Sequence, residues 1–284
     1  MTYHAANGRL MCHLCGHSEK MPLLCPSCSS RHLYTVGAGT QRVEEEITDI
    51  SSELTFVRMD ADTLRSQRSH AEILASFTES HADILLGTQM VAKGLDFPNV
   101  TLVGVLDADM SIFSNDFRSG EQTFSTLLQV TGRSGRGEKP GRAVIQTNSP
   151  NHPVLQSFCR GDYAAYADDE LELRRLLVYP PYCDLVRLRV LGLDDFLTNK
   201  AAKALASLAR AVAKKHYTSE FISVLGSAPS QVLRQSGRYR YEVTIKMGAN
   251  KKTREYIALL LGFFAEQTEY RKFSVTADIN AYGM

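Results

Sequence analysis

Short apolar runs alternate with amphipathic segments between residues 54 and 147, and this alternation constrains the fold of the chain most strongly. The apolar runs, which we expect to be strands, are residues 54–59, 83–88, 100–106 and 143–147. The segments between them include residues 70–80 and 124–133, whose apolar side chains recur at helical spacing. Strands that alternate with helices form a parallel sheet covered on both faces. The sequence therefore predicts an α/β lobe.

The pattern changes at Pro180-Pro181, because consecutive prolines end the helix predicted at residues 163–177. The order predicted downstream is strand, helix, strand, strand, helix, strand, at residues 185–192, 198–215, 221–225, 239–247, 251–264 and 273–279. This βαββαβ order is typical of a ferredoxin-like α+β domain. We therefore predict a small cysteine-rich segment at residues 1–34, the α/β lobe at 35–178 and the α+β domain at 179–284.

The composition of the 284 residues is that of an ordinary globular protein, with 44% apolar residues, 22% charged residues and a formal net charge of +1. This balance gives no sign of a polyanionic partner, so a nucleic-acid site must come from local clusters of basic residues. The sequence has no apolar run of about eighteen residues and no secretory signal. We therefore expect no membrane span and a cytoplasmic location.

Four of the six cysteines form two C-x-x-C pairs, Cys12 with Cys15 and Cys25 with Cys28. Two such pairs can place four thiolates around Zn²⁺, and a chain without a secretory signal favours metal binding over disulfides. A redox pair is the alternative. Because about thirty residues are too few for an adequate core, a metal would hold this segment folded. The isolated Cys159 and Cys183 are expected to be buried, inert thiols.

Two further motifs carry most of the functional information. The first, at residues 87–100, is G-T-Q-M-V-A-K-G-L-D-F-P-N-V, and the second, at residues 129–136, is Q-V-T-G-R-S-G-R. They resemble motifs V and VI of superfamily 2 helicases, whose second RecA-like lobe carries both motifs with a strand between them. Taken alone, the second motif is also compatible with an ordinary exposed basic turn, because basic clusters are weak signals.

The resemblance implies a role for each motif residue. Arg136 would be the arginine finger that reaches ATP held by another lobe, and Arg133 would support the same phosphate. Phosphoryl transfer depends on positive charge placed at the γ-phosphate, which two arginines three residues apart can supply. The resemblance further assigns the nucleotide side of the cleft to Gln129, Gly94 and Asp96, and contacts with the DNA backbone to Thr88 and Gln89.

Acidic residues near these motifs have simpler interpretations. Asp107 and Asp109 follow a predicted strand and could pass for catalytic carboxylates. A metal site needs more convergent ligands, so we expect both to be polar residues at a strand end. Residues 44–46 are three glutamates, which we expect to be solvated in the first turns of a helix that begins near Thr40.

The order of these pieces along nearly the whole chain is similar to that of the PriA family of replication-restart helicases, also called primosomal protein N′. The pieces are the C-x-x-C pairs, G-A-G-T-Q-R-V-E-E-E-I, R-M-D-A-D-T, the two helicase-like motifs, Q-T-N-S-P-N-H-P-V-L-Q and Y-P-P-Y. The resemblance implies an ATP-dependent 3′-to-5′ DNA helicase that acts in replication restart and primosome assembly, with Zn²⁺, ATP and Mg²⁺ as cofactors. It further implies forked or branched DNA, single-stranded DNA-binding protein and primosome proteins as partners.

The sequence departs from this family in two respects. It contains neither the phosphate-cradling loop G-x-x-x-x-G-K-[ST] nor the D-E-x-H motif that binds Mg²⁺. Members of the family hold both in a first lobe, and they carry four C-x-x-C pairs that bind two zincs in a nested arrangement. In that arrangement the two pairs present here would belong to different zincs. We therefore expect a fragment that does not hydrolyse ATP by itself, and a shared zinc stays an open alternative.

Basic side chains cluster in residues 227–254, where the single acidic residue is Glu242. The basic residues are Arg234, Arg238, Arg240, Lys246, Lys251, Lys252 and Arg254. Alternation along a strand places Tyr239 and Tyr241 on the core face, with Arg238 and Arg240 on the opposite face. We predict that these two arginines bind the DNA backbone with little base readout. The alternative is a solvated basic edge that discourages strand aggregation.

Two other functions are compatible with the sequence. One is a non-catalytic, zinc-containing DNA-binding module, and the other is a different superfamily 2 enzyme such as an RNA helicase. A preference for forked DNA over duplex RNA would distinguish the leading interpretation from the RNA helicase. A phosphate-cradling loop and a D-E-x-H motif directly upstream would distinguish an enzyme from a module.

Overall fold

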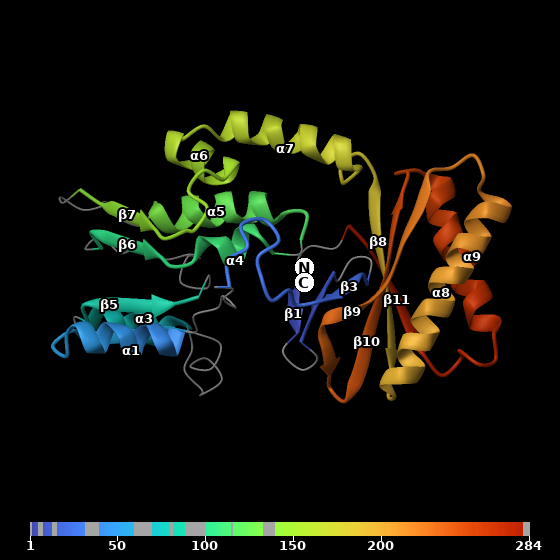
Figure 1. The fold of residues 1–284 in the computed structure, drawn as a ribbon, viewed down its shortest axis with the longest axis horizontal. Coiled ribbons are helices and arrows are strands. Elements are labelled where there is room, and N and C mark those ends of the chain that lie inside the picture. The colour runs from blue at the N-terminus through green and yellow to red at the C-terminus, as the bar shows by residue number, and fades with distance from the viewer. Residues whose placement is uncertain are drawn as a thin grey trace. The chain divides into compact units, whose positions relative to one another are not determined.

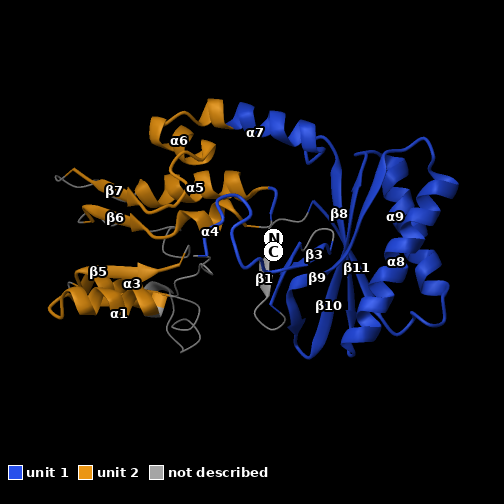
Figure 2. Ribbon diagram, viewed as in Figure 1, with its two compact units in different colours: residues 1–33, 115–117, 167–284 blue, residues 34–114, 118–166 orange. Residues whose placement is uncertain are grey.

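A computed structural model describes residues 2–4, 8–12, 16–31, 40–59, 70–79, 82–88, 100–114, 116–132 and 140–280. The chain divides into two compact units (Figure 2). Unit 1 comprises residues 1–33, 115–117 and 167–284, and unit 2 comprises residues 34–114 and 118–166. Across the described ranges, no helix combines the length and the apolar character that a membrane span needs.

Unit 2 alternates strands with helices, as the sequence predicts. Its elements are α1 (Thr40–Ile50), β4 (Phe56–Met59), α3 (His70–Glu79), β5 (Ile84–Gly87), β6 (Leu102–Val105), α4 (Ala108–Ile112), α5 (Ser119–Thr131), β7 (Arg142–Ile145), α6 (Pro153–Arg160) and the start of α7 (Tyr163–Leu177). Strand β4 pairs with β5 and β6 pairs with β7, in both cases in parallel. The prediction of an α/β lobe with parallel strands is therefore confirmed.

The strand pair β6–β7 has different surroundings on its two faces. Val105 and Ile145 pack against a buried cluster contributed by α4, α5 and α6. On the other face, Leu102 and Val144 are 60% and 47% exposed. Successive side chains of a strand point to opposite faces, so one face of this pair is covered and the other is open. Among the described residues, one face of this pair is thus covered by α5 and by the short helices α4 and α6, which were not predicted.

Unit 1 contains a four-stranded antiparallel sheet and a small N-terminal sheet (Figure 1). Its elements are β1 (Thr2–His4), β2 (Arg9–Met11), β3 (Ser18–Lys20), β8 (Asp184–Gly192), α8 (Asp195–His216), β9 (Ile222–Gln235), β10 (Arg238–Met247), α9 (Lys251–Glu266) and β11 (Ser274–Ile279). The strand order of the larger sheet is β11-β8-β10-β9. The predicted βαββαβ order of elements is confirmed, although β9 extends ten residues beyond the predicted end at residue 225.

Helices α8 and α9 lie on the same side of the larger sheet (Figure 1). Alternate residues of β8 and β10 point toward them and join one buried cluster with side chains from both helices. These strand residues are Val186, Leu188, Val190, Val243 and Ile245, all of which are fully buried. The core of unit 1 therefore lies between the sheet and the two helices.

Helices α8 and α9 begin at side-chain caps. The Asp194 carboxylate accepts a hydrogen bond from Leu197 N–H at the start of α8. At the start of α9, Asn250 and Thr253 form a capping box. These caps satisfy backbone N–H groups that have no partner within the helix, and so they fix where each helix begins.

Strands β9 and β10 form a long hairpin. The two residues that connect them, Ser236 and Gly237, have φ angles of 51° and 78°. Positive φ at both positions is the geometry of the tight turn that matches the twist of paired strands, and glycine adopts it without steric cost. The turn carries Arg238 at the first position of β10 and Arg234 close to the end of β9.

Candidate functional site

The helicase-like motifs lie only partly within the described residues. Thr88 follows the last residue of β5 and is exposed. Gln129 lies in the last turns of α5, where it is exposed and its Nε2 donates a hydrogen bond to Ser125 Oγ at 3.1 Å. The other motif residues with a predicted role, Arg133, Arg136, Gly94, Asp96 and Gln89, lie outside the described residues. Their roles stay predictions.

Asp109 joins the segment after β6 to the segment after β7. It accepts hydrogen bonds from Thr147 Oγ1 at 2.9 Å and from Asn148 N–H at 2.6 Å. Burial alone would raise the pKa of Asp109, but these hydrogen bonds and one from Ser149 outweigh it and hold the pKa below its usual value. The carboxylate is therefore used internally, which agrees with the interpretation of Asp109 as a polar residue at a strand end.

Residues near Asp109 hold the same region in place. Asp107 has a left-handed backbone with φ 53°, and its N–H donates to Gln146 Oε1 at 3.3 Å. His152 caps α6, because its Nδ1 accepts a hydrogen bond from Val154 N–H at 3.4 Å. Burial lowers the pKa of His152, and the nearby Asp109 opposes that shift.

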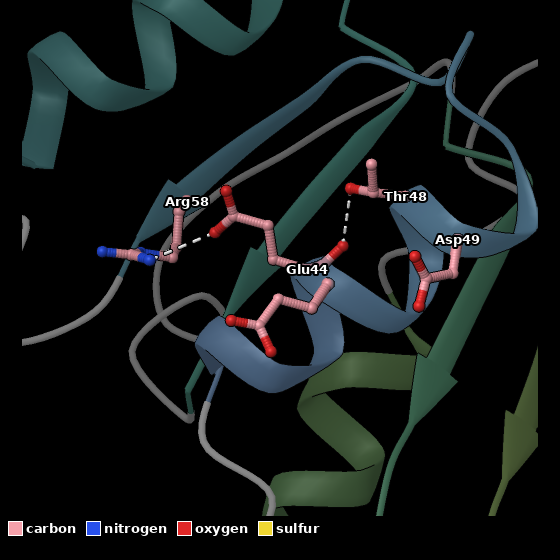
Figure 3. A pocket seen from close by; sticks show the side chains of 5 residues that line it. Glu44, Thr48, Asp49 and Arg58 are labelled. Atoms are coloured by element: carbon pink, nitrogen blue, oxygen red, sulfur yellow. Dashed lines mark hydrogen bonds and ion pairs between the residues drawn. The ribbon is translucent and has the colours of Figure 1, made fainter.

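A shallow acidic pocket lies between α1 and β4 (Figure 3). Glu44, Glu45, Thr48 and Asp49 of the helix line it together with Arg58 of the strand. Arg58 Nη1 lies 3.1 Å from Glu44 Oε2. Of the three glutamates predicted to be solvated, Glu45 and Glu46 are exposed, and Glu44 is half-buried beside Arg58 of β4. Three carboxylates around one guanidinium repel phosphate, so this pocket does not suit a nucleotide.

The two cysteine segments share two backbone hydrogen bonds among their described residues. In the first, Gly16 N–H donates to Cys12 O at 2.9 Å and Cys12 N–H donates to His17 O at 2.9 Å. In the second, Ser29 N–H donates to Cys25 O at 2.8 Å and Cys25 N–H donates to Ser30 O at 2.9 Å. The fourth residue after the first cysteine has positive φ in both, 77° at Gly16 and 58° at Ser29. We call these segments the first knuckle (residues 12–17) and the second knuckle (residues 25–30).

The second knuckle presents a sulfur atom suited to a metal. The backbone N–H groups of Cys28 and Ser27 donate to the Cys25 sulfur and lower the pKa of its thiol. A thiolate held in this way is the ligand that zinc prefers. Cys15 lies outside the described residues, and within the described ones Cys12 does not join Cys25 and Cys28 in a group able to hold a metal.

The isolated cysteines differ from each other. Cys183 is 1% exposed, as predicted, and burial raises the pKa of its thiol. The prediction is wrong for Cys159, which is exposed. It occupies the solvent side of the two-turn helix α6, whose buried side is formed by Val154, Leu155 and Ser157.

Several basic residues of the segment 227–254 have acidic or carbonyl partners. Lys252 lies 3.5 Å from Glu220, Lys251 lies 3.8 Å from Glu255, and Arg254 lies 3.7 Å from Asp184. Lys246 donates to Leu177 O at 2.7 Å. The positive charge that the sequence places over the whole segment is therefore partly neutralised by contacts with residues outside it.

Three arginines gather at the end of the β9–β10 hairpin. Arg238 is exposed, Arg240 donates to Gln235 Oε1, and the Arg234 guanidinium lies 5.2 Å from the centre of the Tyr239 ring. Sequence reasoning did not single out Arg234, although the pairing of Arg234 with Tyr239 follows from the tight turn between the strands. The next tyrosine of the strand, Tyr241, is buried and its hydroxyl donates to Asp195 Oδ1 at 2.7 Å, which confirms its predicted core position.

Comparisons with known proteins agree with the order of these features. Residues 17–138 match the model of the helicase conserved C-terminal domain, and residues 175–282 match that of the primosomal protein N C-terminal domain. Replication restart protein PriA of Bacillus subtilis (strain 168) is 42% identical over 284 residues, which is 100% of this chain and 35% of that protein. The chain belongs to the PriA family, of which it is a C-terminal portion.

Other PriA proteins show the same relation. The protein of Synechocystis sp. is 42% identical over 87% of this chain and 30% of its own length, and that of Haemophilus influenzae is 34% identical over 90% and 35%. The chain thus spans about a third of the length of the curated relatives it matches. In this PriA-family chain, the first match contains the second knuckle and both helicase-like motifs, and the second match contains the four-stranded sheet.

Proposed function

We propose that the chain is the C-terminal part of an ATP-dependent 3′-to-5′ DNA helicase that acts in replication restart and primosome assembly. The observation that carries this proposal is the succession of two family matches, a helicase C-terminal domain followed by a primosomal protein N C-terminal domain. Forked or branched DNA is the proposed substrate, and single-stranded DNA-binding protein and primosome proteins are the proposed partners. A cytoplasmic location follows from this role.

The proposed organisation has three parts. Residues 1–34 form part of a zinc-binding insertion, residues 35–178 form the second RecA-like lobe, and residues 179–284 form a ferredoxin-like DNA-binding domain. The parallel strand pairs of unit 2 support the second assignment. The βαββαβ order and the strand order β11-β8-β10-β9 support the third.

The proposed nucleotide contacts come from the second helicase-like motif and from the loop after β5. Arg136 acts as the arginine finger and Arg133 supports the same phosphate. The nucleotide side of the cleft is lined by Gln129, Gly94 and Asp96. ATP with Mg²⁺ supplies the phosphoryl group, and the arginines stabilise the negative charge that develops during its transfer. The exposed position of Gln129 at the end of α5 leaves it available for this role.

The proposed zinc ligands are Cys12, Cys15, Cys25 and Cys28. The matching backbone hydrogen bonds of the two knuckles support this assignment, because each knuckle turns the chain around its first cysteine in the same way. Bound zinc would supply a cross-link that holds a segment too small to form its own core. The zinc content of the purified chain would distinguish a metal shared by the two knuckles from one metal at each.

The proposed DNA contacts are Thr88 and Gln89 in the lobe and Arg238 and Arg240 on the hairpin, joined by Arg234. Within the described residues, no ion pair with an acidic residue is found for these three arginines, whereas Lys251, Lys252 and Arg254 each have one and Lys246 donates to a backbone carbonyl. Arginines beside a tight turn can neutralise phosphates, which makes binding strongly dependent on salt.

A chimera tests the proposed function. These 284 residues would replace the matching part of Bacillus subtilis PriA, and unwinding of a forked DNA would be measured beside unwinding of a duplex RNA. We expect ATP-dependent unwinding of the fork only. A chimera that folds and binds ATP but unwinds RNA, or that binds forks without any unwinding, would contradict the helicase assignment and favour an RNA helicase or a binding module, respectively.

A further inference from the structure

The larger sheet of unit 1 has a second face, opposite α8 and α9, that is polar and yet buried. Val243 and Ile245 of β10 pack against the helices, so Glu242 and Thr244 point the other way. Glu242 is 8% exposed and Thr244 is 2% exposed. Buried polar groups need partners and a cover that excludes water, so another part of the chain must lie over this face.

The polar groups of this face are hydrogen-bonded to one another. Arg189 Nε of β8 and Ser230 Oγ of β9 both donate to Glu242 Oε1 at 3.0 Å. Ser230 is 3% exposed, and Ala228, which pairs with Glu242 across the strands, is 1% exposed. The buried patch therefore extends from β8 across β10 to β9.

The first knuckle touches this patch. A Cβ added at Gly16 would collide with the carbonyl oxygen of Ser227 and would lie 3.8 Å from Cα of Ala228. Gly16 also has φ 77°, which a residue with a side chain adopts only with strain. The knuckle therefore approaches β9 as closely as a backbone can, at a position that only glycine fits.

An aromatic ring lies over a second point of the same sheet face. Lys246 Nζ lies 3.6 Å from the centre of the Tyr179 ring, and Lys246 is on the same face as Glu242 and Thr244. The Tyr179 ring therefore covers the part of this face around Lys246.

The charges of the two surfaces are complementary. Zinc is held by thiolates, and a site in which four of them surround one divalent ion would carry a net negative charge. Arg187 of β8 is 6% exposed, and burial lowers the pKa of Lys246, so both cations have lost part of their hydration. An anionic metal site beside them would offset part of the cost of that desolvation.

We propose that the first knuckle is the cover of this sheet face, and that metal binding at the knuckle stabilises the β9–β10 hairpin with its three arginines. The inference rests on the proposed zinc site and connects it with the proposed DNA surface. Without metal the knuckle loses its fixed shape, water reaches Glu242 and its partners, and the hairpin opens more often.

Hydrogen exchange of the whole 284-residue chain, before and after zinc is removed with a chelator, tests this coupling. We expect amides of residues 227–230 and 242–244 to exchange at least about tenfold faster without zinc, while amides of α8 change little. A chain that contains no zinc would overturn both the proposed metal site and this inference. A chain that contains zinc, but whose hairpin exchange does not respond to its removal, would overturn this inference alone.

Two glycines of the N-terminal segment give a matched pair of variants. Gly8 and Gly16 both have positive φ, at 64° and 77°, but a Cβ at Gly8 meets nothing within 4 Å. We expect Gly16→Ala to speed hairpin exchange as zinc removal does, and Gly8→Ala to leave it unchanged. Equal exchange in the two variants would contradict the close contact with β9.

A variant on the sheet side tests the contact without any change to the knuckle itself. Ala228→Leu enlarges a residue beneath the first knuckle and leaves every cysteine in place, so we expect several-fold faster transfer of zinc to a colorimetric chelator. Val232→Leu, at a position on the same strand that is 56% exposed, is the control. Identical zinc transfer in both variants would show that the knuckle does not rest on the sheet.

Discussion

Unit 1 and unit 2 bury their apolar residues in different ways. In unit 1, β8, β10, α8 and α9 contribute to one continuous cluster that includes Leu188, Leu205 and Leu260. In the described part of unit 2, most buried apolar side chains form two small clusters around α4, α5 and α6, and Met59 and Ile73 are buried outside them. A continuous core gives unit 1 stability of its own. Unit 2 instead places polar residues such as Thr88 and Asp109 beyond the ends of its strands, where an α/β sheet usually binds ligands.

The largest expected effect separates the chemistry of unit 2 from the DNA surface of unit 1. In the chimera with Bacillus subtilis PriA, Arg136→Ala should lower DNA-stimulated ATP hydrolysis by about a thousandfold, because an arginine finger stabilises the transition state. Fork binding should be unchanged. The control is Arg142→Ala, which changes an exposed arginine of β7. Equal ATPase rates in the two variants would contradict the assignment of Arg136 as the arginine finger.

The next effect measures the core of unit 1. Leu205 is fully buried, so Leu205→Ala should lower the free energy of unfolding of unit 1 by about 3 kcal/mol through lost burial and a cavity. Denaturant unfolding followed by hydrogen exchange of each unit measures this change, and Lys203→Ala at an exposed position of α8 is the control. A loss shared equally by both units would show that they unfold together.

A smaller effect compares two ion pairs of unit 1. Glu242→Ala leaves Arg189 and Ser230 without their shared acceptor in a mostly buried place, and should destabilise unit 1 by about 2 kcal/mol. Lys200→Ala removes an exposed pair with Glu269 and should change the stability of unit 1 much less, because solvent screens the pair. Equal costs in urea unfolding would show that the face around Glu242 is open to water.

The hairpin arginines give a more modest change in binding. Arg238→Ala combined with Arg240→Ala should weaken fork binding and reduce the slope of log K against log salt by about 1.8, if each arginine neutralises one phosphate. Fluorescence anisotropy over a salt series measures the slope. Lys251→Ala combined with Lys252→Ala is the control, because these two lysines lie near Glu255 and Glu220. An unchanged slope in the arginine variant would contradict the phosphate contacts and would favour the alternative, in which these arginines form a solvated basic edge.

The smallest effect is a difference in pH dependence. Asp109 and His152 in unit 2 have lower pKa values in the folded chain than in the unfolded chain. Their contribution to stability is therefore present at a pH above the unfolded pKa values, and it is lost as the pH falls through the folded ones. Burial raises the pKa values of Tyr241 and Tyr256 in unit 1, so their contribution is present below about pH 10 and is lost above it. Thermal unfolding should therefore show acid loss mainly in unit 2, reduced in Asp109→Asn, and alkaline loss mainly in unit 1. The same pH profile for both units would contradict this.

The sequence predicted most elements of the fold because their patterns are local. Helix α7 has the predicted bounds, and β5, β8, β10 and α9 lie within a few residues of theirs. The prediction failed for α4 and α6, because helices of five and eight residues show too little periodicity to be recognised. It also ended β9 too early, because residues 226–235, which contain a glycine, a proline and several polar residues, are held in the strand by pairing with β10.

Among the candidate site residues, the cysteine pairs and the helicase-like motifs were determined by the sequence alone, because their residue types and spacings are themselves the signal. Only the tertiary structure decided that Lys252 pairs with Glu220, that Glu242 is buried, and that Gly16 meets β9. Most of these facts depend on residues far apart in the chain. Burial and charge pairing arise between such residues, and no local pattern encodes them.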